Sequence, residues 1–304
     1  METPEFDLTF EAAYGEAVPV AEGVWRITCN NPSPFTFAGT NSYLVGRGQD
    51  VALIDPGPDN EAHFEALMRA LEGRRLSHIF VSHTHRDHSP LAARLKAETG
   101  AITVAEGPHR AARPLHAGEV NPFAESSDSG FVPDLVLADG AGVAGDGWSL
   151  CGIHTPGHTA NHMAFALEGT DVLFSADHVM AFATPVVAPP DGSMADFMAS
   201  LDKLLARRDR IFFPGHGGPV VDPPAFLRGL RTHRRMRERA VLERVKAGDR
   251  EIATMVKAIY ASTDPRLHGA AGLSVLAHLE DLVARGQVSC EGPPALLSRY
   301  FYAD

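Results

Sequence analysis

Short apolar runs separated by turn residues fill the first quarter of the chain and predict β-strands. Gly46 and Gly48 separate two of these runs, and the segment 55–58, Asp-Pro-Gly-Pro, cannot continue a strand. The expected strands cover residues 18–20, 24–29, 41–45 and 51–54.

After residue 58 the spacing of apolar residues changes to that of a helix. Apolar residues recur three or four positions apart from Phe64 to Leu71 and predict a helix over 60–71. A short buried strand over 77–82 and a helix over about 89–99 follow. Strands and helices therefore alternate through this half of the chain.

The segment from Glu106 to Gly130 has little periodicity and is rich in proline, glycine, serine and histidine. A loop of this length in a compact domain is usually functional. We expect it to form a flap on the substrate side, with His109 and His116 exposed to solvent.

A second β-rich half runs from about Leu135 to Phe213, and apolar residues at helical spacing predict a helix over 194–205 within it. Two similar halves of strands and helices predict an α+β fold, a four-layer αββα sandwich with two sheets inside and helices outside. The expected strands of this half are 148–151, 163–167, 172–174 and 211–213.

The pattern becomes helical after Pro223 and Pro224, and a short strand and a turn follow the last helix. Three helices with a short β-hairpin predict a winged-helix-like unit. We therefore predict two domains, over residues 1–222 and 223–304. Such units bind nucleic acid or act as packing and dimer modules, so RNA and a second copy of the chain are both candidate partners. The expected helices are 225–246, 252–260 and 272–285.

Charge and composition narrow the classes of function. A formal net charge of −11 argues against a wholly basic nucleic-acid-binding protein, although residues 226–250 carry nine Lys/Arg against three Asp/Glu. Apolar segments all fall short of the roughly 18 residues of a membrane span, and the acidic start does not resemble a secretory signal. Cys29, Cys151 and Cys290 are few and far apart, which suggests a reducing compartment, most simply the cytoplasm.

The densest cluster of candidate metal ligands follows the strand expected at 77–82. The run 83–88, His-Thr-His-Arg-Asp-His, brings three imidazoles and one carboxylate within six residues. Both groups bind zinc. Because α/β folds place ligand chemistry where strands end, this position favours a metal site over a polar loop with incidental histidines.

Two further histidines and an aspartate follow expected strands. His158 lies in Thr-Pro-Gly-His-Thr, Asp177 comes directly after an apolar run, and His216 lies in Phe-Pro-Gly-His-Gly. Incidental surface histidines would not recur at strand ends in this way, so these three residues are candidate ligands as well.

The spacing His83-x-His85-x-Asp87-His88, together with the later residues, resembles the metallo-β-lactamase fold superfamily. The resemblance implies αββα layering and two zinc ions, although iron or manganese would also suit the ligand types. It further implies that Asp177 bridges the two ions and that Asp87 orients the nucleophile or carries a proton. The implied ligands are His83, His85 and His158 at the first ion and Asp87, His88 and His216 at the second.

The segment 39–46, Gly-Thr-Asn-Ser-Tyr-Leu-Val-Gly, resembles the β-lactamase-like-protein-2 subgroup, near the glyoxalase II type enzymes. The segments 177–180 and 188–192 and the helical C-terminal part fit this subgroup too. Its members include a single-stranded-RNA endoribonuclease, and many bacterial relatives are labelled thioester hydrolases. One departure is Ala176, which stands before Asp177 where the family usually has glycine.

Three functions are alternatives at this point. The first is a dinuclear zinc-dependent hydrolase in which a metal-bridging hydroxide attacks a small ester, thioester or lactone. The second is a metal-dependent single-stranded-RNA endoribonuclease, which the arginine-rich helix favours. The third is a non-enzymatic protein with structural zinc, which the carboxylates argue against because structural sites mostly use Cys and His. We expect the first, with Asn41, Asn161 and His178 either touching substrate or bonding loop backbone.

Overall fold

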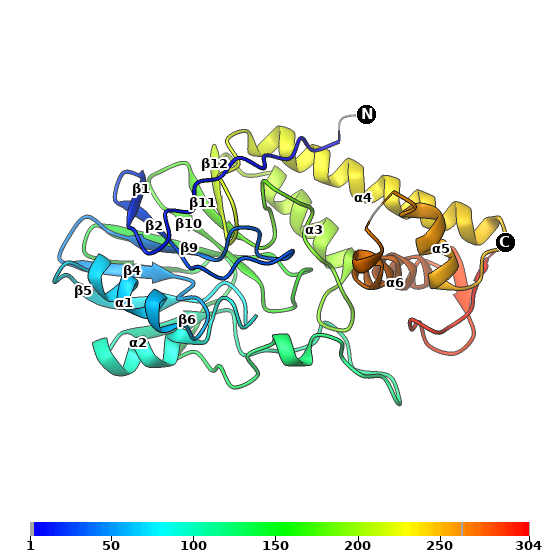
Figure 1. Ribbon diagram of the computed structural model, residues 1–304, viewed down its shortest axis with the longest axis horizontal. Coiled ribbons are helices and arrows are strands. Elements are labelled where there is room, and N and C mark those ends of the chain that lie inside the picture. Colours follow the sequence, from blue (N-terminus) through cyan, green and yellow to red (C-terminus); the bar gives the residue numbers. More distant parts are fainter. Residues whose placement is uncertain (1–2, 263, 304) are drawn as a thin grey trace.

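The structure, a computed structural model that describes residues 3–262 and 264–303, contains two β-sheets packed face to face (Figure 1). In the first sheet each strand pairs with the next one along the chain. The pairs from β1 to β4 are antiparallel and those from β4 to β7 are parallel. The strands are β1 (Val18–Ala21), β2 (Val24–Thr28), β3 (Asn41–Val45), β4 (Asp50–Ile54), β5 (Arg75–Phe80), β6 (Ile102–Ala105) and β7 (Leu135–Val136).

The second sheet has the strand order β12-β11-β10-β9-β8. The pairs from β8 to β11 are antiparallel, whereas β11 and β12 are parallel. The helix between β11 and β12 returns the chain to the end of the sheet where β11 begins, which a parallel pair requires. The strands are β8 (Gly142–Gly145), β9 (Trp148–His154), β10 (Met163–Leu167), β11 (Val172–Ala176) and β12 (Ile211–Pro214).

Helices α1 (Glu61–Ala70) and α2 (Leu91–Thr99) cover the outer face of the first sheet. α1 begins after Asn60, whose side chain accepts a hydrogen bond from the backbone N–H of His63. The apolar face of α1 packs with α2 onto the sheet through residues such as Leu67. The helices predicted over 60–71 and 89–99 are therefore confirmed, with ends shorter by one or two residues.

Alternate residues of facing strands form the core between the sheets. The rings of Tyr43 and Phe174 lie 5.1 Å apart, and those of Phe80 and Phe165 lie 5.2 Å apart, so each pair joins the two sheets. Helix α3 (Met194–Leu205) covers the outer face of the second sheet. The layers are thus helix, sheet, sheet and helix, which confirms the predicted αββα sandwich.

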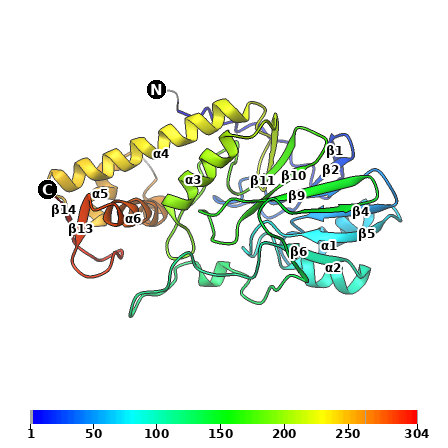
Figure 2. The same cartoon turned by 180° about the vertical axis from the view of Figure 1, so that it is seen from behind.

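The C-terminal part extends from this sandwich along helix α4 (Pro223–Lys246), which Figures 1 and 2 show as the longest helix. The first half of α4 packs with α3, and its second half packs with the later elements. The boundary predicted between residues 222 and 223 falls where α4 begins, and it stays a prediction because α4 belongs to both apolar clusters. The later elements are α5 (Ile252–Ile259), α6 (His268–Ala284), β13 (Val288–Cys290) and β14 (Tyr300–Tyr302), with short 3-10 turns at Ala124–Ser126 and Pro265–Leu267.

Besides β7, two strands of the sandwich were not predicted from the apolar pattern. β6 is four residues long, and β8 has glycine at both ends, so neither offers a run of large apolar side chains. The placement of Leu135 in the second half was also wrong, because β7 pairs with β6 in the first sheet. The second sheet begins at β8 instead.

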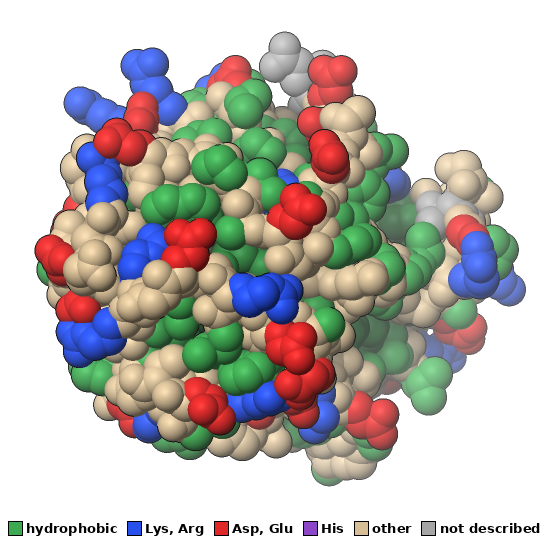
Figure 3. All heavy atoms as spheres, turned by 60° about the vertical axis from the view of Figure 1, so that its left-hand side comes forward, with side chains coloured by type: hydrophobic (Ala, Val, Ile, Leu, Met, Phe, Trp, Pro, Cys, Tyr) green, Lys and Arg blue, Asp and Glu red, His purple; other side chains and the backbone are tan. Residues whose placement is uncertain are grey.

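The surface carries both signs of charge. On the face drawn in Figure 3, acidic and basic side chains are interspersed rather than gathered into one patch. Within residues 3–262 and 264–303, no helix combines the length and the apolar character that crossing a bilayer requires.

Candidate metal centre

The loops that follow β5, β9, β11 and β12 meet at one edge of the two sheets and carry every candidate ligand. The run 83–88 follows β5, His158 lies between β9 and β10, Asp177 follows β11 directly, and His216 follows β12. The parallel pair β11 and β12 ends at the same edge, so Asp177 and His216 are brought together by the strand register.

The structure brings the candidate ligands together in three groups, and within each group the ligand atoms lie within 4.8 Å of one another. Two of the groups are the two triads that the resemblance implied, and the third contains the acid implied as a bridge. The groups are His83 with His85 and His158, Asp87 with His88 and His216, and His83 with His88 and Asp177. That these residues bind metal stays a prediction.

Partners on the outer ring nitrogens orient the histidines. The Nδ1 of His158 faces the carbonyl oxygen of Val186 at 2.6 Å, and the Nδ1 of His216 faces that of Gly39 at 3.1 Å. Because a carbonyl only accepts, each Nδ1 carries a proton, so Nε2 is the atom whose lone pair a metal ion would receive. These lone pairs point into the centre, which is the arrangement that metal-binding histidines adopt.

The inward-facing atoms are nitrogen and oxygen atoms that converge on one point. The Nε2 of His88 and the Oδ1 of Asp177 are buried without a hydrogen-bond partner among the described residues. The Nδ1 of His85 lies 3.0 Å from the Nε2 of both His83 and His158. Since a buried polar atom without a partner is costly, a divalent cation would satisfy the two partnerless atoms, and the nitrogen and oxygen atoms of the set fit zinc, iron or manganese.

The three-histidine group favours neutral imidazoles. Burial, followed by the neighbouring His88 and His85 rings, lowers the pKa of His83 well below its ordinary value. Burial, followed by His158, lowers the pKa of His85 to about 3. Burial also lowers the pKa of His158. A neutral imidazole is the form that binds metal, so this group is in its ligand form at neutral pH.

The second group is dominated by its carboxylates. Burial by itself would lower the pKa of His216, but Asp177 and Asp87 outweigh burial and raise that pKa to about 9. Burial by itself would raise the pKa of Asp87, but His88 and His216 hold it well below its ordinary value. Both acids are therefore ionised and supply the negative charge that a pair of cations needs.

Two backbone positions decide how closely these loops approach. A Cβ atom at Gly215 would collide with the carboxylate of Asp177, so only glycine fits between β12 and His216. Ala176 has a φ of 44°, in the left-handed region. The departure from the family's usual glycine therefore stands where the backbone itself favours glycine.

Asp55 belongs to the candidate site but was not predicted from the sequence. It is 2% exposed and accepts hydrogen bonds from the backbone N–H and the hydroxyl of Ser82, both at 2.7 Å. Its Oδ2 also faces the Nδ1 of His88 at 3.0 Å. Asp55 thus fixes both the start of the histidine run and one ring within it. Its position directly after a buried strand was a usable signal, but we interpreted it only as the end of that strand.

Three residues next to the ligand motifs do not line the pocket described below. Asn41 donates to two backbone carbonyls of the loop that carries His216, and Asn161 donates to two carbonyls of the flap. His178 is fully buried, and its ring lies 4.5 Å from that of Phe197. For the two asparagines, the structure supports the loop-bonding alternative over substrate contact.

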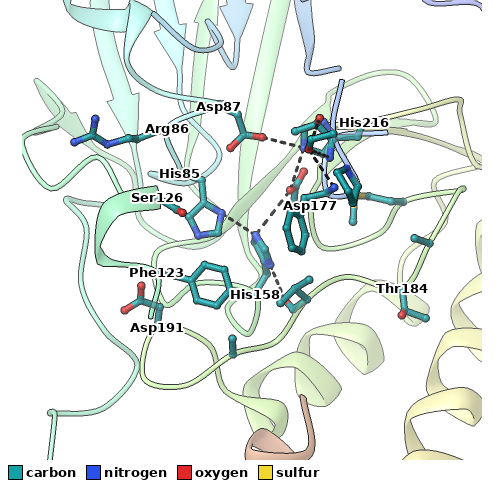
Figure 4. A pocket seen from close by; sticks show the side chains of 18 of the residues that line it. His85, Arg86, Asp87, Phe123, Ser126, His158, Asp177, Thr184, Asp191 and His216 are labelled. Atoms are coloured by element: carbon teal, nitrogen blue, oxygen red, sulfur yellow. Dashed lines mark hydrogen bonds and ion pairs between the residues drawn. The ribbon is translucent and has the colours of Figure 1, made fainter. Parts of the chain in front are cut away.

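A pocket of about 480 Å³ opens onto the centre (Figure 4). Its walls come from the loop between β2 and β3, from the flap, and from the loop after β11. Besides the candidate ligands, Arg86, Glu125 and Asp191 bring charge to a lining that is otherwise largely apolar. The larger apolar side chains in the walls are those of Phe35, Phe123, Met180, Phe182 and Val186.

The flap prediction is confirmed in part, because Phe123, Glu125 and Ser126 line the pocket. The expectation that His109 is exposed was wrong. Its side chain is 12% exposed, and its ring nitrogens lie 3.2 Å from the hydroxyl of Thr84 and 3.7 Å from a carboxylate oxygen of Asp191. His116 is also partly buried. The flap is folded back onto the loops of the site rather than standing free in solvent.

Two family models match the chain. The model described as "Metallo-beta-lactamase superfamily" matches residues 35–216, a range that contains every candidate ligand. The model described as "Beta-lactamase associated winged helix domain" matches residues 252–293. The second match confirms the winged-helix unit predicted from the helical pattern of the C-terminal part.

Named relatives cover the chain to different extents. The beta-lactamase-like protein 2 homolog of Drosophila melanogaster is 29% identical over 88% of this chain and 90% of that protein. The lactamase-like protein adaB of Aspergillus niger is 31% identical over 75% of this chain. The atrochrysone carboxyl ACP thioesterase of Claviceps purpurea is 29% identical over 72% of this chain. The matches span 65% and 64% of these two fungal proteins, which is less than two thirds of their length.

Solved structures resemble nearly the whole chain. A metallo-beta-lactamase family protein from Thermus thermophilus is similar with a TM-score of 0.73 and 27% identity, covering 93% of this chain and 99% of that one. A beta-lactamase domain protein from Burkholderia ambifaria shares the fold with a TM-score of 0.80 and 23% identity, covering 99% and 97%. With its fold, its clustered ligand positions and these matches, the chain belongs to the metallo-beta-lactamase superfamily.

Proposed function

We propose that this chain is a dinuclear zinc-dependent hydrolase of small esters, thioesters or lactones. The observation that carries the proposal is the convergence of candidate ligand atoms beside a largely apolar pocket. The group of His83, His85 and His158 would bind one zinc ion. The group of Asp87, His88 and His216 would bind the other. Asp177 would bridge them, because its carboxylate oxygens lie 3.3 to 3.8 Å from imidazole nitrogens of both triads.

Zinc ions bound there would supply a hydrolytic nucleophile at neutral pH and stabilise negative charge on the attacked carbonyl. The remaining tasks belong to the protein. The Oδ2 of Asp87 lies 3.3 Å from the Nε2 of His88 and 3.2 Å from that of His216. Its side chain is 26% exposed and lines the pocket, so we assign it a second role beside metal binding: it orients the nucleophile or accepts its proton.

The walls of the pocket support a substrate with an apolar acyl part. Phe35 is 51% exposed on one wall, and Phe123 is partly exposed on another. An apolar acyl group between these walls would remove both rings from water, which favours binding in proportion to the area buried. Relatives named as acyl-carrier-protein thioesterases point in the same direction, so a thioester is our preferred substrate class.

Four arginines of the basic helix α4 make contacts within the protein instead of facing an RNA backbone. Arg231 pairs with Asp202 at 2.7 Å, and Arg244 pairs with Asp249 at 2.5 Å. Arg234 is buried, and Arg237 stacks on the ring of Tyr260. The endoribonuclease alternative therefore rests on the exposed Arg228, Arg235 and Arg239, and we rank it second.

A substrate panel tests the proposal. The zinc-loaded protein would be assayed with acyl thioesters, carboxylic esters, lactones, a phosphodiester and single-stranded RNA. We expect turnover of the carbonyl substrates, with thioesters the fastest, and loss of that turnover in His83→Ala. Turnover of phosphodiesters alone would overturn the proposal.

The same panel decides the alternative function. Contacts to RNA phosphates weaken steeply as salt rises, and removing exposed arginines reduces the slope. Salt-independent RNA binding, or full RNA cleavage after replacing Arg235 and Arg239 with alanine, would count against an endoribonuclease that uses α4. A cytoplasmic location and a homodimer stay predictions, which fractionation and light scattering of the full chain would check.

A further inference from the structure

We propose that Arg234 of helix α4 is a positioning residue for the metal centre, acting through the backbone of residues 185–186 on the ring of His158. The inference rests on the proposed function, because it concerns the metal affinity of the predicted ligands. It also assigns the C-terminal part of the chain a role in the chemistry of the sandwich domain.

The first link joins His158 to the loop after β11. The Nδ1 of His158 donates to the carbonyl oxygen of Val186 at 2.6 Å, a short hydrogen bond. This bond sets both the tautomer and the direction of the ring, so the Nε2 atom faces His85 at 3.0 Å. The position of one carbonyl therefore decides where a candidate metal ligand points.

The second link joins the same loop to α4. The guanidinium of Arg234 donates from Nη2 to the carbonyl oxygen of Pro185, the residue before Val186. Within the described part of the chain, residues 182–187 make two hydrogen bonds, namely this one and the one to His158. Arg234 is thus the polar anchor of this segment on the side away from the pocket.

The side chain of Val187 is buried in the cluster around α3 and α4, and it contributes to holding the loop. Packing of that side chain fixes its position, but it leaves the neighbouring peptide planes freer to rotate than a directional hydrogen bond does. Loss of the Arg234 bond should therefore shift the Val186 carbonyl while the loop stays packed.

Burying the charged guanidinium of Arg234 costs free energy, and its surroundings offset that cost only in part. It is 3% exposed, and burial lowers its pKa to about 10. Its guanidinium lies over the ring of Phe197, 4.9 Å from the centroid, and its Nε has no hydrogen-bond partner among the described residues. A buried cation with a single polar contact is rarely kept for stability alone.

The test uses the full chain with Arg234→Met, which keeps an unbranched apolar side chain out to the position of Nε but removes the guanidinium and its donor. Arg228→Met is the matched control, because Arg228 is exposed on the same helix and makes no hydrogen bond or ion pair within the described residues. The zinc affinity of each protein would be measured by competition with a chromophoric chelator. Cobalt substitution would report the ligand geometry through its visible spectrum.

We expect the first equivalent of zinc to bind about tenfold more weakly in Arg234→Met, the lower end of the effect of losing a direct partner of a metal ligand. The cobalt spectrum should change as well, and Arg228→Met should match the unmodified protein in both. If Arg234→Met does not fold, Arg234→Gln removes the same contact with a milder polar change and gives the same comparison.

Unchanged zinc affinity and an unchanged cobalt spectrum in a folded Arg234 variant would overturn the inference, even if the variant melts at a lower temperature. That result would leave the proposed function standing. An unmodified protein that binds no zinc would instead overturn the proposed function, and the inference with it.

Discussion

Ala176 shows how a single backbone angle is balanced against side-chain burial. Its φ of 44° lies in a region that costs an L-residue roughly 1–2 kcal/mol, and glycine avoids that cost. Replacing it with glycine also loses about 0.8 kcal/mol from the buried methyl group and about 0.5–1 kcal/mol from the greater freedom of the unfolded chain. The free energy gained by relieving the strain and the free energy lost on replacement by glycine nearly cancel.

We therefore expect Ala176→Gly to change the free energy of unfolding by less than about 0.5 kcal/mol. Ala164→Gly is the control, because Ala164 is fully buried in β10 and relieves no strain. It should lose about 1.5 kcal/mol. Denaturant unfolding of both variants measures the difference, and equal losses would show that Ala176 carries no strain.

Asp55 is a second case in which one residue decides the outcome, because its hydrogen bond to His88 orients a candidate metal ligand. We expect Asp55→Asn to weaken binding of the second zinc ion by about 10–100-fold, since the amide replaces a charged acceptor behind a metal ligand. Asp59→Asn is the matched control, being exposed nearby on the same loop. Zinc content per chain at a low, buffered concentration of free zinc distinguishes the variants. Two equivalents retained in Asp55→Asn would contradict the assignment.

The candidate ligands could be predicted from the sequence, whereas Asp55 and Arg234 could not, for a physical reason. The candidate ligands have a fixed local spacing, because a strand end presents neighbouring side chains to one point, and that spacing is visible along the chain. Asp55 and Arg234 act across distances in sequence of 33 and 49 residues to their partners. Such partnerships depend on which loops meet in space, and the apolar pattern does not contain that information.

At the scale of elements, the long helices and central strands could be predicted because their apolar periods are strong. β7 and β8 could not, because a two-residue strand and a glycine-flanked strand owe their pairing to neighbours already in place. The flap is a third case. Its position over the pocket follows from contacts such as that of Asn121 with Asp191 at 2.8 Å, which no local pattern reveals.

The flap supplies a prediction about substrate binding. Phe123 lines the pocket and is partly exposed, so Phe123→Ala should raise the KM for thioesters with apolar acyl groups by about tenfold, corresponding to roughly 1.4 kcal/mol of lost contact. The kcat should change little, because the candidate ligands are untouched. Leu115→Ala is the control, since Leu115 is an exposed flap residue outside the pocket wall. A matching rise in KM for a short acetyl thioester would argue against an acyl-binding wall.

For the molecule as a whole, the negative net charge and the candidate metal centre would act together. A net charge of −11 produces repulsion within the protein, and two divalent cations would cancel four of those charges at the place where two ionised acids converge. The loops that meet there come from both sheets, so the cations would also tie the two halves of the sandwich together. Metal binding should therefore contribute to the stability of the whole domain and not of one loop.

Removal of metal tests this directly. A ligand that binds only the folded state at a concentration about 1,000 times its Kd stabilises that state by about 4 kcal/mol, which in a domain of this size raises the melting temperature by roughly 8 °C or more. We expect chelated protein to melt lower by about that amount and to recover when zinc is restored. His158→Ala should respond less to both treatments, because it breaks one triad. If chelation left the melting temperature of the unmodified protein unchanged, the converging side chains would have to be satisfied by protons alone, with imidazolium–carboxylate pairs in place of cations.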